Sequence, residues 1–75
     1  MTVWNVELTD TFGGEANYAW VRRAEVTGES RRQVMRRAKS AVGMSGVRGK
    51  TFDHGDMLEF RPYGLLQVMF VAWAD

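Results

Sequence analysis

One histidine lies between two aspartates in the segment Asp53-His54-Gly55-Asp56, and this is where metal chemistry would be sought first. Two carboxylates and an imidazole could in principle hold a divalent cation. Aspartate and glycine are also common in tight turns, for local backbone reasons. The segment is therefore predicted to be a hairpin turn. We assign no metal site, no cofactor and no catalytic residue, and no spacing suggests a catalytic triad.

Two glycine-containing segments resemble phosphate-binding loops only in part. Phe12-Gly13-Gly14-Glu15 lacks the Gly-x-Gly-x-x-Gly pattern and precedes no predicted helix. Gly49-Lys50-Thr51 has the residue types that end a P-loop, but Met44 occupies the position of the first glycine. Nucleotide hydrolysis is therefore excluded, and the chain is predicted not to be an enzyme.

The basic side chains are concentrated in the middle of the chain. Residues 20–50 hold nine basic and two acidic side chains, a net charge of +7, whereas each flanking segment carries −3. Arginine offers a planar fork of donors that matches phosphate and carboxylate groups. A basic helix beside a basic strand is a footprint for nucleic acid, although a solvated helix face has the same composition. The residues predicted to contact phosphates are Arg22, Arg23, Arg32, Arg36 and Lys39.

Aromatic residues on the predicted strands allow two interpretations. Tyr18 and Trp20 share strand parity with Arg22, so all three are predicted to project from one face of the sheet. If that face is open, it combines stacking groups with a cation, as in RNA-binding folds. If it is the core face, Arg22 lies at its rim.

Length and composition bound the class of protein. The chain has 75 residues, of which 45% are hydrophobic and 25% are charged, and it has no cysteine. These values predict one soluble domain over residues 1–75 and exclude disulfides and thiolate metal sites. A chain this small has little material for an enclosed catalytic pocket, which favours binding. The longest apolar stretch, Leu65–Ala74, is too short for a spanning helix, so we expect a cytoplasmic protein with no membrane partner.

The first half of the chain predicts a hairpin followed by a helix. Alternating apolar residues predict a strand over Val3–Leu8, a loop over Asp10–Asn17 and a second strand over Tyr18–Val26. Ser30 and Gln33 have the spacing of a capping box, in which Gln33 reaches back to the Ser30 N–H. A helix is expected over about Arg31–Val42, ended by Gly43 in the left-handed conformation.

The second half predicts three strands, over Gly49–Asp53, Met57–Arg61 and Leu65–Ala74, with a turn through Arg61-Pro62-Tyr63-Gly64. The last strand is apolar on both faces, so a central place in the sheet is expected. Because one helix covers only one face, the other face must be covered by loops, by curling of the sheet or by another chain.

The resulting order β-β-α-β-β-β defines an α+β domain with one helix packed on a mainly antiparallel sheet. This element order resembles that of some small anti-CRISPR proteins, in which a helix packs on a curved antiparallel sheet. The resemblance is one of architecture and implies an inhibitor or accessory protein of phage or mobile-element type.

Two functions follow from these patterns. The first is a non-enzymatic binding module whose Arg-rich helix and neighbouring strand contact an acidic partner. Nucleic-acid backbone, DNA or RNA, is the leading candidate, and an acidic protein surface is the other. The alternative is a protein–protein interaction module that binds through the sheet face, with a homodimer among the possibilities.

Overall fold

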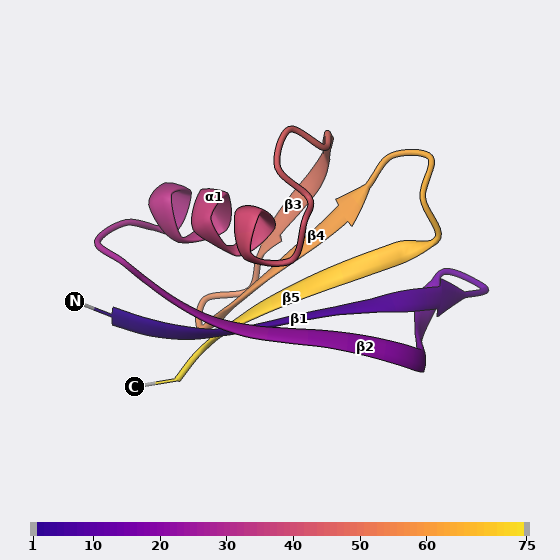
Figure 1. Ribbon diagram of the computed structural model, residues 1–75, viewed down its shortest axis with the longest axis horizontal. Coiled ribbons are helices and arrows are strands. Elements are labelled where there is room, and N and C mark those ends of the chain that lie inside the picture. Colours follow the sequence, from indigo (N-terminus) through magenta and orange to yellow (C-terminus); the bar gives the residue numbers. More distant parts are fainter. Residues whose placement is uncertain (1, 75) are drawn as a thin grey trace.

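The computed structural model describes residues 2–74, which form one helix and one five-stranded sheet (Figure 1). Along the sheet the strands follow the order β2-β1-β5-β4-β3, and all neighbours are antiparallel. In chain order the elements are β1 (Thr2–Phe12), β2 (Glu15–Gly28), α1 (Arg31–Ala41), β3 (Gly49–Asp53), β4 (Met57–Pro62) and β5 (Gln67–Trp73). The predicted α+β class and element order are confirmed. Among residues 2–74, no helix is long and apolar enough to cross a membrane.

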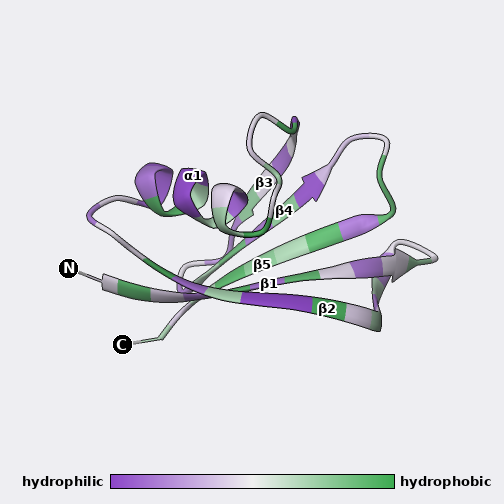
Figure 2. Cartoon of the chain, viewed as in Figure 1, coloured by the Kyte–Doolittle hydropathy of each residue, from purple (hydrophilic) through white to green (hydrophobic). Residues whose placement is uncertain are grey.

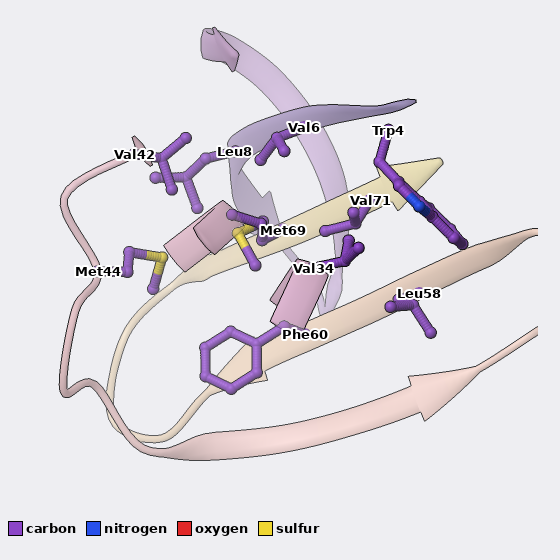
Figure 3. Packing of buried hydrophobic residues seen from close by; sticks show 11 residues of the cluster. Trp4, Val6, Leu8, Val34, Val42, Met44, Leu58, Phe60, Met69 and Val71 are labelled. Carbon is purple, nitrogen blue, oxygen red and sulfur yellow. The ribbon is translucent and has the colours of Figure 1, made fainter. Parts of the chain in front are cut away.

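The core lies between α1 and one face of the sheet. From the helix, Val34, Ala38 and Val42 are buried because residues four apart share one helix face. They pack on alternate residues of the strands, including Val6 and Val71, which are paired across β1 and β5 (Figure 3). Hydrophobic residues run along most of β5, whereas much of α1 is hydrophilic (Figure 2). The predicted central position of the last strand is confirmed, because β5 lies between β1 and β4.

The first hairpin is longer than the sequence predicted. The loop expected over Asp10–Asn17 is instead a tight turn at Gly13 and Gly14, with φ angles of 63° and 84°. A two-residue turn with both residues at positive φ matches the twist of paired strands. The polar residues on either side therefore continue the ladder instead of forming a loop.

A large bulge bends β2 within this hairpin. Thr9 pairs with Val21 and Thr11 with Ala16, so the single residue Asp10 faces the four residues 17–20. The Asp10 carboxylate accepts hydrogen bonds from the Ala19 N–H at 2.9 Å and the Asn17 amide at 3.0 Å. Buried Thr9 donates its hydroxyl to the Trp20 carbonyl at 2.7 Å. These bonds satisfy polar groups that the interrupted ladder leaves unpaired.

The bulge overturns the predicted parity of the β2 aromatics. Trp20 and Arg22 lie together beside the C-terminal end of α1, where they line one pocket. Tyr18, which has a φ of 57°, instead lines a pocket with Glu7 and Phe70 on the helix-free face. The prediction that all three project from one face is therefore wrong for Tyr18, because the extra residues reset the alternation.

The helix-free face is covered at one end by curling of the hairpin. Arg61 on β4 donates to the carbonyl of Gly14, in the turn of the β1–β2 hairpin, at 2.6 Å. Beneath this end, Thr9 and Val68 have no exposed surface. Curling of the sheet, one of the three covers expected from the sequence, is therefore present.

The helix cap and the last turn differ in detail from the expectations, whereas the conformation that ends the helix matches them. The Ser30 hydroxyl accepts from the Gln33 N–H at 3.1 Å as predicted, but the Gln33 side chain accepts from the Glu29 N–H at 2.8 Å, and not from Ser30. The helix ends at Ala41, one residue before the expected end, and Gly43 adopts the predicted left-handed conformation with a φ of 78°. In the second half, Pro62 completes β4 and β5 begins at Gln67, so the turn lies after the proline.

Candidate functional site

A groove with a volume of about 410 Å³ runs between α1 and the edge strand β3. We call it the basic groove. Four of the five α1 residues that line it are basic, and the β3 side contributes a hydroxyl, a carboxylate and apolar surface. Its lining is Arg31, Arg32, Met35, Arg36 and Lys39 of α1, Ser45 and Gly46 of the following loop, and Thr51, Asp53 and Leu58 of β3 and β4.

Helix periodicity explains why these cations gather on one wall. Val34 and Ala38 fix the rotation of α1 by facing the core. Residues three and four apart are neighbours on a helix surface, with Cβ atoms about 5–6 Å apart. Arg32, Arg36 and Lys39 therefore form one row beside the apolar face, directed toward β3. Met35 is half-buried and lines the groove between this row and the strands.

One end of the basic groove is bridged by an ion pair. Arg31 Nη1 lies 3.2 Å from Asp53 Oδ1, and the Arg31 guanidinium also lies over the Trp4 ring, 5.6 Å from its centroid. Asp53 is further held by the Gly55 N–H, which donates to it at 2.9 Å. The only carboxylate in the lining is therefore already paired, and Arg31 is occupied.

The other three cations have no acidic partner. Arg32 and Arg36 are exposed and form no ion pair with any residue from 2 to 74. Lys39 Nζ lies 4.6 Å from the centroid of the Phe60 ring, a cation–π contact that leaves its charge uncompensated. The groove thus presents three positive charges to whatever enters it.

The structure separates Arg22 and Arg23 from this groove. Arg22 Nη1 donates to the Val42 carbonyl at 2.9 Å, on the β2 side of the helix C-terminus. Arg23 points to the opposite face, where its Nε lies 3.2 Å from Glu7 Oε2. Of the five residues predicted to contact phosphates, three are brought together and two are not.

The groove also contains residues that the sequence did not single out as site residues. Arg31 was counted only in the charge of the segment, and Thr51 was considered only as the end of an incomplete P-loop pattern, which was rejected. Their proximity depends on the docking of α1 near the β3 edge, which is a contact between distant parts of the chain. No local pattern in the sequence carries that signal.

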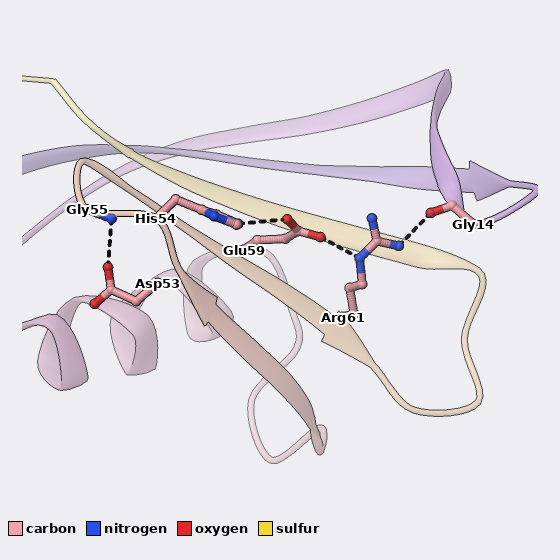
Figure 4. Close-up of polar contacts among 6 residues, drawn as sticks. All are labelled: Gly14, Asp53, His54, Gly55, Glu59 and Arg61. Atoms are coloured by element: carbon pink, nitrogen blue, oxygen red, sulfur yellow. Dashed lines mark hydrogen bonds and ion pairs between the residues drawn. The ribbon is translucent and has the colours of Figure 1, made fainter.

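The predicted hairpin turn at Asp53-His54-Gly55-Asp56 is confirmed, with Gly55 at a φ of 95° (Figure 4). His54 Nε2 lies 3.0 Å from Glu59 Oε1, and the other Glu59 oxygen accepts from Arg61. Within residues 2–74, no three His, Asp or Glu side chains gather as a metal site requires.

The fold and the site together define a small α+β domain with one helix on an antiparallel sheet and a basic groove along the sheet edge. No family model, curated protein or solved structure matches the chain. The likeness of element order to small anti-CRISPR proteins therefore stays a prediction.

Proposed function

We propose that the chain is a non-enzymatic binding module that takes nucleic-acid phosphates into the basic groove. The observation that supports this most directly is the row of Arg32, Arg36 and Lys39, which lines one groove without an acidic partner among the described residues. Unpaired cations gathered on one wall suit a polyanion whose charges repeat at short intervals.

The chemistry favours backbone contact over base reading by these cations. Guanidinium forks bind phosphate oxygens in a bidentate manner, whereas Lys39 acts as a point charge. Contacts to phosphates position a nucleic acid without carrying sequence information. Three such contacts to a single strand give a slope of log affinity against log salt of about −2. Binding is therefore expected to be modest and strongly dependent on salt.

The helix-free face supports the alternative less well. Its charges are largely paired within the chain, as in Glu7 with Arg23 and Glu59 with Arg61. One end is covered by the curled hairpin, which buries Val68. A protein interface through the sheet face would have to form on this partly covered and internally paired surface.

The test is fluorescence anisotropy with labelled single- and double-stranded DNA and RNA, at low and physiological salt. The variant Arg32→Gln/Arg36→Gln removes two charges from the groove. Its matched control, Arg23→Gln/Arg37→Gln, removes two charges outside it, because Arg37 donates to the Thr27 carbonyl on the β2 side. All four side chains are exposed, so both variants are expected to fold.

We expect the groove variant to bind at least about tenfold more weakly, with a salt slope smaller by about 1.4. The control is expected to bind nearly as the wild type does. Equal weakening in both variants would mean that the overall charge matters and the groove does not. A lack of binding at low salt would overturn the proposal.

A further inference from the structure

We infer that the basic groove accepts a single strand, with its phosphates along α1 and its bases against the edge of β3, in preference to a duplex. This inference rests on the proposed function and deepens it. It comes from three features on the β3 side of the groove: a free strand edge, an apolar floor and a limited size.

The free edge of β3 carries backbone hydrogen-bonding groups along the rim of the groove. The His54 N–H donates to the Met57 carbonyl at 2.8 Å, and the Tyr63 N–H donates to the Arg48 carbonyl at 2.9 Å. Because bonded pairs alternate along an antiparallel ladder, the intervening odd-numbered residues of β3 turn their N–H and C=O groups outward. Thr51 is the central one of these, and none of the strands formed by residues 2–74 pairs with this edge.

Donors and acceptors at this edge match the chemistry of nucleobases. The edge of a base carries its own donors and acceptors, which backbone groups can pair with when the base is not already paired. The Thr51 hydroxyl adds a group that both donates and accepts. In a duplex the Watson–Crick edges are occupied, so this pairing is available only to an unpaired strand.

The floor of the groove is apolar, and phosphates alone would gain no binding energy from contact with it. Half-buried Met35 and buried Leu58 lie between the cations of α1 and the β3 edge. The flat face of a base gains from covering such a surface, and a methionine side chain adapts its shape to it. Across the groove, the cations of α1 come first, then the apolar floor and then the hydrogen-bonding edge of β3. A nucleotide has the matching order of phosphate, flat base face and base edge.

The size of the groove sets the length of strand that it holds. From Arg32 to Lys39 the helix rises about 10 Å. A single strand that follows α1 over this distance can set phosphates against Arg32, Arg36 and Lys39. The groove volume of about 410 Å³ suits the bases of a short unpaired strand. A duplex is too wide to enter a groove of this volume, so it could touch only the rim.

The experiment compares three labelled probes at one low salt concentration. They are a short oligodeoxythymidine, an abasic strand with the same number of phosphates, and a duplex of the same length. We expect the oligodeoxythymidine to bind about tenfold more tightly than the abasic strand, and the duplex to bind no more tightly than the abasic strand.

Variants of Met35 test whether the bases lie against the apolar floor of the groove. Met35→Ser is expected to reduce the preference for the intact strand to about threefold or less, without changing the affinity for the abasic strand. Met35→Leu keeps an apolar floor and is expected to keep the preference. An unchanged preference in Met35→Ser would overturn the inference, because the bases would then lie elsewhere.

The remaining outcomes separate this inference from the proposed function. If the intact and abasic strands bind equally, or the duplex binds best, the inference is wrong while phosphate binding stands. If no nucleic acid binds, both are wrong. A polyglutamate peptide of equal charge that displaces the strand at lower concentration would overturn both in favour of an acidic protein partner.

Discussion

Neighbouring arginines on α1 have different roles because their side chains meet different surroundings. Arg31 is held by Asp53 and the Trp4 ring, whereas Arg32 has no acidic partner among residues 2–74. An exposed ion pair contributes little to stability, but it orients the side chain and neutralises the acid. The pairing of Asp53 therefore matters for the groove mainly because it removes a negative charge from the lining.

Glu59 binds both His54 and Arg61 on the helix-free face, and these contacts predict a dependence of stability on pH. Partial burial raises its pKa, but hydrogen bonds from Arg61 and His54 and the positive charge of Arg61 outweigh burial, so the pKa lies below its ordinary value of 4.5. A lowered pKa in the folded state contributes stability above the unfolded value, and that stability is lost as the pH falls through the folded value.

We therefore expect the free energy of unfolding to fall more steeply below pH 4.5 in the wild type than in Glu59→Gln. Urea unfolding at neutral pH and at about pH 3 measures this difference. The comparison is needed because Asp10, whose pKa is lowered chiefly by the Asn17 amide, also titrates in acid. Parallel curves for the two proteins would contradict the assigned role of Glu59.

At the scale of the element, α1 depends on its N-terminal cap. The Ser30 hydroxyl and the Gln33 side chain satisfy two backbone N–H groups in the turn that carries Arg31 and Arg32. Without the cap, this turn frays and the cations lose their fixed positions.

Ser30→Ala is expected to lower the free energy of unfolding by about 1 kcal/mol, because the Gln33 N–H loses its acceptor. Ser40→Ala, at an exposed position inside α1, is the matched control and is expected to change stability by less than about 0.5 kcal/mol. Chemical unfolding measures both. An equal loss in the two variants would show that the hydroxyl of Ser30 does not cap the helix.

At the scale of the whole molecule, the curled hairpin changes the argument for self-association. The sequence required a cover for the second face of the last strand, and a second copy was one option. Val68 is covered instead by the chain itself, through the contact of Arg61 with Gly14. The homodimer stays an untested possibility, but this part of the sheet does not require it.

We expect the chain to sediment as a monomer at high micromolar concentration. Exposed Phe12 and Leu66 project near the end of the hairpin, and they are the strongest candidates for an opposing apolar contact. Analytical ultracentrifugation of the wild type and of Phe12→Ser/Leu66→Ser tests this. A dimer in the wild type would contradict the expectation, and its loss in the variant would place the contact at this end.

Local patterns in the sequence determined most of the secondary structure. The Ser30–Gln33 spacing and the apolar residues around Val34 and Ala38 predict α1 because capping and helical periodicity are properties of neighbouring residues. The two-sided apolar pattern of residues 65–74 predicts a central strand for the same reason. The row of Arg32, Arg36 and Lys39 also follows from helical spacing alone.

Only the tertiary structure decided which cations share a surface. The alternation of strand side chains already implies that Arg22 and Arg23 face opposite ways, but not which of them lies near α1. The bulge opposite Asp10 resets that alternation for Tyr18. No glycine or proline among residues 17–20 predicts the bulge from the sequence. The groove itself forms because α1 packs on one face of the sheet, beside β3. Such long-range packing depends on the whole core, so short stretches of sequence do not encode it separately.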